Sequence, residues 1–190
     1  MSLIRRREMM SKLEQHTTYI ENPSTAYINT GITLANTDRI VLGLSHYRGD
    51  FISGRNASKG SKRFFLGAIM QWAYRPQSYP ISITDGEFHS VECKAGEYVV
   101  DGISSPITGG YTDVSETGDI LIFGAWNQTN PTILDTRRAT CRIYSFDIID
   151  GDGNYKFKGR PSCKNGRYGL LDEVSGDFFG SASNVELIGN

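Results

Sequence analysis

Short runs in which hydrophobic residues recur at every second position dominate this chain. Ile40, Leu42 and Leu44 follow this pattern, which places them on one face of a strand because successive strand side chains point to opposite faces. About a dozen such runs follow from Thr18 onward, separated by turn dipeptides such as Asp101-Gly102. Without alternating helices, this pattern predicts an antiparallel β-sandwich.

The run RIYSFDI shows the same alternation in more detail. It predicts that Tyr144, Phe146 and Ile148 share one face with Arg142, whereas Asp147 points the other way.

Two turns near the C-terminal end have specific predictions. Ser175-Gly176 is predicted as the tip of a hairpin that carries Leu171, Val174 and Phe178-Phe179. Residues 150–154, with the sequence DGDGN, resemble the start of a calcium loop, but the twelfth position that an EF-hand fills with Glu is Pro161. A polar hairpin turn is the favoured interpretation, with a looser calcium site as the alternative.

The only segment that predicts a helix is residues 2–15, SLIRRREMMSKLEQ. It contains no Gly or Pro, Ser2 suits an N-cap, and Glu8 lies four residues before Lys12. An isolated helix of this length is marginal in water, so we expect its apolar stripe to dock on something. The stripe consists of Leu3, Ile4, Met9, Met10 and Leu13. The predicted organisation is a helical arm, 1–17, followed by one sandwich domain, 18–190.

Charge divides the chain at the same place. The 190 residues hold 20 Lys and Arg against 21 Asp and Glu. Residues 1–15 nevertheless carry four basic side chains, with Arg5, Arg6 and Arg7 consecutive, against two acidic ones. The acidic-leaning remainder argues against nucleic acid as the main partner, and the basic arm indicates docking.

Several classes of protein are disfavoured by what the sequence contains. The longest apolar stretch, residues 120–126, is far shorter than the roughly 18 residues of a membrane span. A secretion signal needs about 7–15 apolar residues after its basic start, and no such run follows Arg7. We therefore expect a protein made in the cytoplasm, with no membrane contact. Cys93, Cys141 and Cys163 are widely spaced and form no disulfide or zinc pattern. Cys93 and Cys141 are predicted to be small buried side chains, and no cofactor is expected.

Catalytic carboxylates are also missing from the pattern. A glycosidase needs two carboxylates that face each other across a sugar. Glu116 and Asp119 have the wrong strand parity, and Asp172-Glu173 are adjacent and point to opposite faces. We predict no enzyme activity, and we interpret His89 as a hydrogen-bonded structural histidine rather than a base.

A series of motifs in the same order resembles a known family. They are YIENPSTAYINTGI, FISGR, DGEFHSVE, VVDG, ILIFGA, RIYSFDI and GLLDEVSGDFFG. Together they cover nearly all of residues 18–189, and they resemble concanavalin A-like, laminin-G-like jelly-roll domains of phage and prophage virion structural proteins of gut bacteria. The opening LIRRREMM is similar to the short basic start that such virion proteins carry. The resemblance implies a non-enzymatic virion component of the head-fibre, decoration or tail-appendage type.

Three groups of residues are candidates for binding. The helical arm, with Arg5, Arg6 and Arg7 for charge contacts, is predicted to anchor the chain to other virion proteins or in a homo-oligomer; packing back on its own sandwich and a membrane or nucleic-acid contact are the alternatives. A basic loop is interpreted either as an anion contact or as a solvated loop. Flat aromatic rings are candidates for stacking on a host-surface glycan, with burial in the core as the alternative. The loop residues are Arg55, Lys59, Lys62 and Arg63, and the glycan candidates are Trp72, Tyr74, Trp126 and Asn127.

Overall fold

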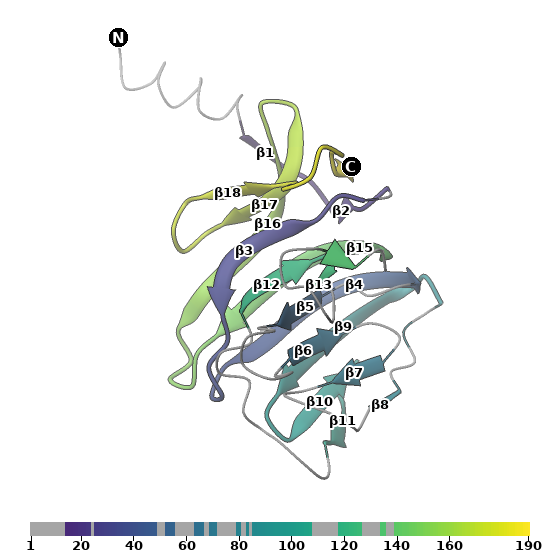
Figure 1. The fold of residues 1–190 in the computed structure, drawn as a ribbon, viewed down its shortest axis with the longest axis vertical. Coiled ribbons are helices and arrows are strands. Elements are labelled where there is room, and N and C mark those ends of the chain that lie inside the picture. The colour runs from purple at the N-terminus through teal and green to yellow at the C-terminus, as the bar shows by residue number, and fades with distance from the viewer. Residues whose placement is uncertain are drawn as a thin grey trace.

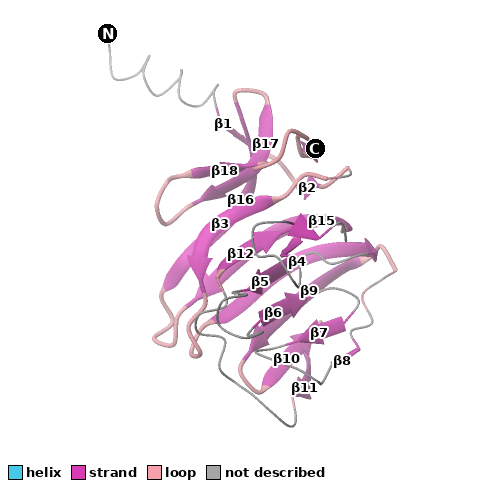
Figure 2. Cartoon of the chain, in the orientation of Figure 1, coloured by secondary structure: helices cyan, strands magenta, loops and turns pink. Residues whose placement is uncertain are grey.

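The computed structural model describes residues 14–23, 25–48, 52–55, 63–66, 69–71, 79–80, 83, 85–107, 118–126, 134–135 and 139–190. Every regular element in these ranges is a β-strand, and all the pairings are antiparallel (Figure 2). The prediction of an all-β antiparallel protein is therefore confirmed. The predicted helix is wrong at its end, because Glu14 and Gln15 belong to strand β1 (Glu14–His16); residues 2–13 lie outside the described ranges.

The larger sheet has eleven strands (Figure 1). Eight of them follow one another in the order β11 (Ile103–Pro106), β10 (Glu97–Val100), β9 (Phe88–Lys94), β4 (Arg39–Arg48), β15 (Thr140–Ile149), β16 (Tyr155–Lys164), β17 (Arg167–Asp172) and β18 (Phe178–Gly180). The other three are β1, β2 (Ile20–Glu21) and β19 (Ile188–Gly189).

A second sheet has six strands. Their order is β3 (Ile28–Thr33), β12 (Asp119–Ile122), β5 (Ile52–Arg55), β6 (Arg63–Leu66), β7 (Ile69–Gln71) and β8 (Tyr79–Pro80). A short pair, β13 (Ala125–Trp126) and β14 (Leu134–Asp135), forms a third sheet.

One hydrophobic core holds side chains from both larger sheets. On β4, the predicted shared face of Ile40, Leu42 and Leu44 is confirmed, since all three are buried in this core. The second sheet contributes Ile28, Ile52, Leu66, Ile120 and Ile122. Burial of this much apolar surface is the main stabilising contribution to the fold.

Cys93 and Cys141 are fully buried in the core, as predicted. Burial raises the pKa of both thiols, and to a smaller extent neighbouring carboxylates do so too. These cysteines therefore act as small apolar side chains, because only the thiolate is reactive.

The predicted face of β15 is wrong at Arg142 and Tyr144. Ile143 pairs with Leu44 and Ser145 pairs with Gly43, so two residues of β15 span one step of β4. This β-bulge reverses the alternation, because it inserts one extra residue into the strand. Cys141 and Ile143 face the core before the bulge and Phe146 and Ile148 face it afterwards, whereas Arg142 and Tyr144 lie on the opposite face.

The two predicted hairpins are confirmed. Asp150 closes the turn between β15 and β16, where its carboxylate accepts the N–H groups of Asp152 and Asn154. Strands β17 and β18 pair with Leu171 opposite Phe178. Between them the carboxylate of Asp172 accepts the N–H of Ser175.

Candidate functional site

Most of the side chains predicted to bind a partner lie outside the described residues. This holds for all eight anchor candidates of the arm, for Trp72, Tyr74 and Asn127, and for Lys59 and Lys62. The backbone of Trp126 lies on β13 opposite Leu134, and the backbones of Arg55 and Arg63 lie opposite each other on β5 and β6. The arm, glycan and anion sites stay predictions.

The segment that follows the arm is built into the large sheet. Gln15 of β1 pairs with Cys163 of β16, and five residues later Ile20 of β2 pairs with Ile143 of β15. The C-terminal strand β19 pairs with β2 on its other side. Residues 14–21 are therefore fixed in the sheet, and Glu14 lies opposite Lys164, beside the β16–β17 hairpin.

An aromatic cluster covers part of the outer face of the large sheet, the face turned away from the core. We call Tyr19, Tyr47, Phe88 and Tyr144 the aromatic patch. The Phe88 and Tyr144 rings lie 5.3 Å apart with planes at 78°, and the Tyr19 and Tyr144 rings lie 5.8 Å apart at 61°. Both are edge-to-face contacts, the arrangement that aromatic quadrupoles favour.

Two members of the aromatic patch are unusually open to solvent. Phe88 is 58% exposed and Tyr47 is 44% exposed. Tyr19 and Tyr144 are half-buried beneath them. A large apolar ring exposed beside other rings is more informative than an isolated exposed side chain, since such patches mark interaction sites.

Irregularities of the strands place these rings. Tyr144 is the extra residue of the bulge in β15, and Tyr47 is the extra residue of a second register shift, between the pairs Thr140–Arg48 and Cys141–His46. The ring of Tyr47 lies over Gly86, where a Cβ would come within 2.4 Å of its Cε1 atom. Bulges are common beside functional sites because they re-aim a side chain.

The charge within the patch is balanced. The guanidinium of Arg142 lies 4.6 Å from the centroid of the Tyr19 ring, and its Nε donates to Glu21 at 2.8 Å. The hydrogen bond that Arg142 donates to Glu21 raises the pKa of Arg142, and Tyr19 and Tyr47 act on it electrostatically in the same direction. Arg142 is thus a cation that a neighbouring carboxylate already neutralises.

A histidine clamp holds the start of β9, the strand that carries Phe88. His89 places Nδ1 2.6 Å from Asp101 and Nε2 3.0 Å from Asp85. Its side chain is 12% exposed, and it lies opposite Leu44 on the core-facing side. The prediction that His89 is hydrogen-bonded is confirmed.

The clamp stabilises opposite charges. Burial lowers the pKa of His89, but the hydrogen bonds to Asp101 and Asp85 outweigh it and raise the pKa above the ordinary value. The hydrogen bond from His89 lowers the pKa of both carboxyl groups. Because ionised carboxylates only accept, both ring nitrogens donate when His89 is protonated.

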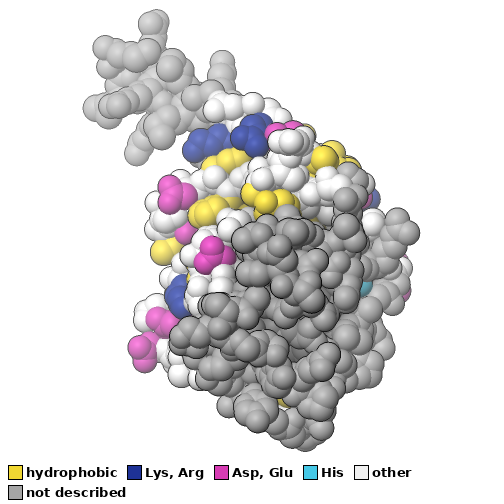
Figure 3. Space-filling model, in the orientation of Figure 1, with side chains coloured by type: hydrophobic (Ala, Val, Ile, Leu, Met, Phe, Trp, Pro, Cys, Tyr) yellow, Lys and Arg dark blue, Asp and Glu magenta, His cyan; other side chains and the backbone are white. Residues whose placement is uncertain are grey.

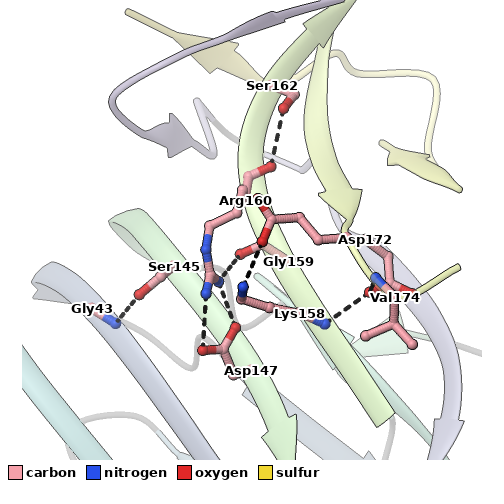
Figure 4. Close-up of polar contacts among 10 residues, drawn as sticks. Gly43, Ser145, Asp147, Lys158, Gly159, Arg160, Ser162, Asp172 and Val174 are labelled. Atoms are coloured by element: carbon pink, nitrogen blue, oxygen red, sulfur yellow. Dashed lines mark hydrogen bonds and ion pairs between the residues drawn. The ribbon is translucent and has the colours of Figure 1, made fainter. Parts of the chain in front are cut away.

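Strands β15, β16 and β17 carry further polar contacts (Figure 4). Arg160 makes two hydrogen bonds to the carboxylate of Asp147, at 2.5 and 3.2 Å. Asp172 accepts the backbone N–H of Lys158 at 2.8 Å and of Val174 at 3.1 Å. The ion pair of Arg160 with Asp147 joins β15 to β16, and the Asp172 carboxylate holds the backbone of β16 and of the turn after β17.

The part of the chain that the structure describes holds no cluster of three or more His, Cys, Asp or Glu side chains placed for a metal ion. Among the same residues there is no helix suited to crossing a membrane. On the face seen in Figure 3, hydrophobic side chains and charges of both signs are interspersed over the described part.

Comparison with protein-family models and with curated proteins finds no match for this chain. The aromatic patch was not among the sites predicted from the sequence. Tyr47 has the outward parity of β4, opposite to Leu44, so alternation alone was sufficient to place it. The face of Tyr144 could not be predicted, because it depends on a bulge that the sequence pattern does not reveal.

Proposed function

We propose that the chain is a non-enzymatic bacteriophage virion structural protein of the head-fibre, decoration or tail-appendage type. Residues 1–13 anchor it to other virion proteins or to further copies of itself, and the β-domain is displayed outward on the particle. The protein is made in the cytoplasm of a bacterial host and resides in the virion. The proposal rests on the resemblance of the ordered motifs and of the basic start.

The displayed domain is proposed to be a concanavalin A-like jelly-roll sandwich. Two antiparallel sheets that share one hydrophobic core favour this finer assignment.

The observation that carries the anchoring role is the integration of residues 14–21 into the large sheet. A docking segment holds a displayed domain in place only if the residues that join the two are themselves fixed in the domain. Here β1 pairs with β16, and a few residues later β2 pairs with both β15 and β19. These pairings give the proposed arm a fixed point of attachment to the domain.

The test is a deletion of residues 1–12, which leaves β1 complete. Phage particles purified by density gradient from the source bacterium are expected to contain the full-length chain, detected by mass spectrometry. The shortened chain is expected to be absent from them while keeping its melting temperature. Shortened chain incorporated at the full-length level contradicts the anchoring role, and particles that lack even the full-length chain contradict the virion role.

A second candidate function is a lectin-like carbohydrate-binding module that recognises bacterial surface glycan. The specific observation in its favour is the aromatic patch, with the exposed ring of Phe88. The two functions are compatible, because a domain displayed on a particle can also bind the host surface. A glycan array with the full chain tests this candidate.

A further inference from the structure

We propose that the aromatic patch is a binding site for an electrically neutral glycan, with the Phe88 ring as the stacking platform. This inference rests on the second candidate function above and locates its site and ligand class. The residues are Tyr19, Tyr47, Phe88 and Tyr144, together with Arg142.

The shape of the patch suits a pyranose ring. The apolar face of a pyranose presents C–H groups to the π face of an aromatic ring. Phe88 is 58% exposed, and the edge-to-face contact with Tyr144 fixes its orientation. A fixed ring loses little conformational entropy when a ligand binds.

Two side chains with hydroxyl groups, Tyr144 and Ser45, lie next to this platform. The Tyr144 hydroxyl lies 3.3 Å from the hydroxyl of Ser45, on the strand next to β9. Tyr47 is 44% exposed and follows His46, which pairs with Cys141 of β15. Such hydroxyls both donate and accept, which matches the hydroxyl groups at the edge of a sugar.

The charges of the outer face decide the ligand class. Arg142 is paired with Glu21 within the patch, and Arg39 with Glu92 and Arg160 with Asp147 lie farther along the same face. A phosphate or sulfate group needs a cation that is free to pair with it. Among the described side chains of this face, carboxylates neutralise these three guanidinium groups, so the ligand that they complement carries no net charge.

The residues of this site differ from the glycan candidates that the sequence suggested. Those were Trp72, Tyr74, Trp126 and Asn127, whereas the aromatic patch lies on β4, β9 and β15 and beside β2. It is also built by two strand irregularities in one small area. The irregularities set the positions of Tyr47 and Tyr144 beside the regularly paired Phe88, and bulges are common next to functional sites because they re-aim a side chain.

The experiment is affinity electrophoresis of the full chain in native gels that contain one polysaccharide each. The neutral probes are dextran, galactomannan and mixed-linkage β-glucan, and the anionic probes are heparin and dextran sulfate. At least one neutral probe is expected to retard the chain, and neither anionic probe is. Phe88→Ala and Tyr144→Ala are each expected to weaken binding to that neutral probe by roughly tenfold.

Two controls accompany these variants. Phe88→Tyr keeps an aromatic ring and is expected to retain binding. Ile103→Ala removes an equally apolar side chain, 72% exposed, from the far strand β11 of the same sheet, and is expected to bind as the unmodified chain does. Thermal melts check that every variant is folded.

The outcomes separate the site from the function. If neutral probes retard the unmodified chain and Phe88→Ala equally, the site is refuted and the lectin-like function stands. Retardation by no probe refutes both. Retardation by the anionic probes alone refutes the neutral ligand class. A dimer in size-exclusion chromatography that Phe88→Ala abolishes assigns the patch to self-association and also overturns the proposal.

Discussion

Replacing Ile20 with Ala is the most direct test of whether the chain after the arm is an integral part of the fold. Ile20 is fully buried, and on β2 it pairs with Ile143 on one side and with Gly189 on the other. The substitution removes three buried carbon atoms from a core shared by both sheets. Surrounding side chains relax only partly around such a deletion, so a cavity term adds to the lost transfer free energy.

The expected loss in the free energy of unfolding is about 2–5 kcal/mol, the usual range for a buried Ile→Ala change. In a domain of this size, 1 kcal/mol shifts the melting temperature by about 2–4 °C. The melting temperature should therefore fall by roughly 4–20 °C. Urea unfolding followed by tryptophan fluorescence and thermal melting followed by circular dichroism measure the two quantities.

The matched control is Ile188→Ala, on the neighbouring strand β19. Ile188 is 47% exposed and pairs with Glu21, so the same chemical change there is expected to cost less than about 1 kcal/mol. Equal losses for the two variants would refute the reasoning, because β2 would then contribute no more than a surface segment. Deleting residues 1–12 should leave the melting temperature unchanged, and a fall would indicate that the arm packs on its own domain.

Three further predictions concern contacts elsewhere in the described part. Gly169→Ala should destabilise the protein by about 1–3 kcal/mol in urea unfolding, because the added Cβ would lie 2.3 Å from the carbonyl oxygen of Phe179 on the next strand. Gly180→Ala, whose added Cβ would have its nearest atom 3.5 Å away, should be much less destabilising. His89→Gln should lower the melting temperature most between pH 3.8 and 6.5, the ordinary pKa values of its carboxylate partners and of the imidazole. Its folded-state pKa is raised, so the clamp is fully present below pH 6.5 and is lost as the pH rises through that higher value; a constant difference up to pH 9 would refute this. Asp147→Ala leaves the half-buried Arg160 without its two hydrogen bonds and should cost about 1–3 kcal/mol; a loss within error in urea unfolding would count against the pair.

The strands and turns could largely be predicted from the sequence, because they depend on local patterns. Alternation placed Ile40, Leu42 and Leu44 in the core, and the turn residues located the hairpin at Ser175-Gly176. Cys93, predicted to be a small buried side chain, is buried. Each of these features depends on residues within a few positions of one another.

The features that could not be predicted depend on pairing between distant segments. Glu14 and Gln15 have good helix propensity, yet they form a strand because β16 offers them a partner about 150 residues away in the sequence. Tertiary pairing overrides propensity at such positions. The bulge at Tyr144 arises in the same way, from the register of β15 against β4. Because the aromatic patch requires that bulge, its geometry was beyond any local pattern.

Residues 14–21 both attach the arm to the sheet and carry Tyr19 of the aromatic patch. This determines which variants can separate the two roles. Glu14 begins β1 and Tyr19 of the patch follows five residues later, immediately before β2. A substitution within residues 14–21 disturbs both the exit of the arm and the ring beneath Arg142. The anchoring role is therefore separable only by changes before residue 14, and the glycan site only by changes on β4, β9 or β15. If particle attachment fails after Phe88→Ala while the domain remains folded, the patch itself belongs to the docking surface, and the division of the chain into an anchor and a displayed domain is wrong.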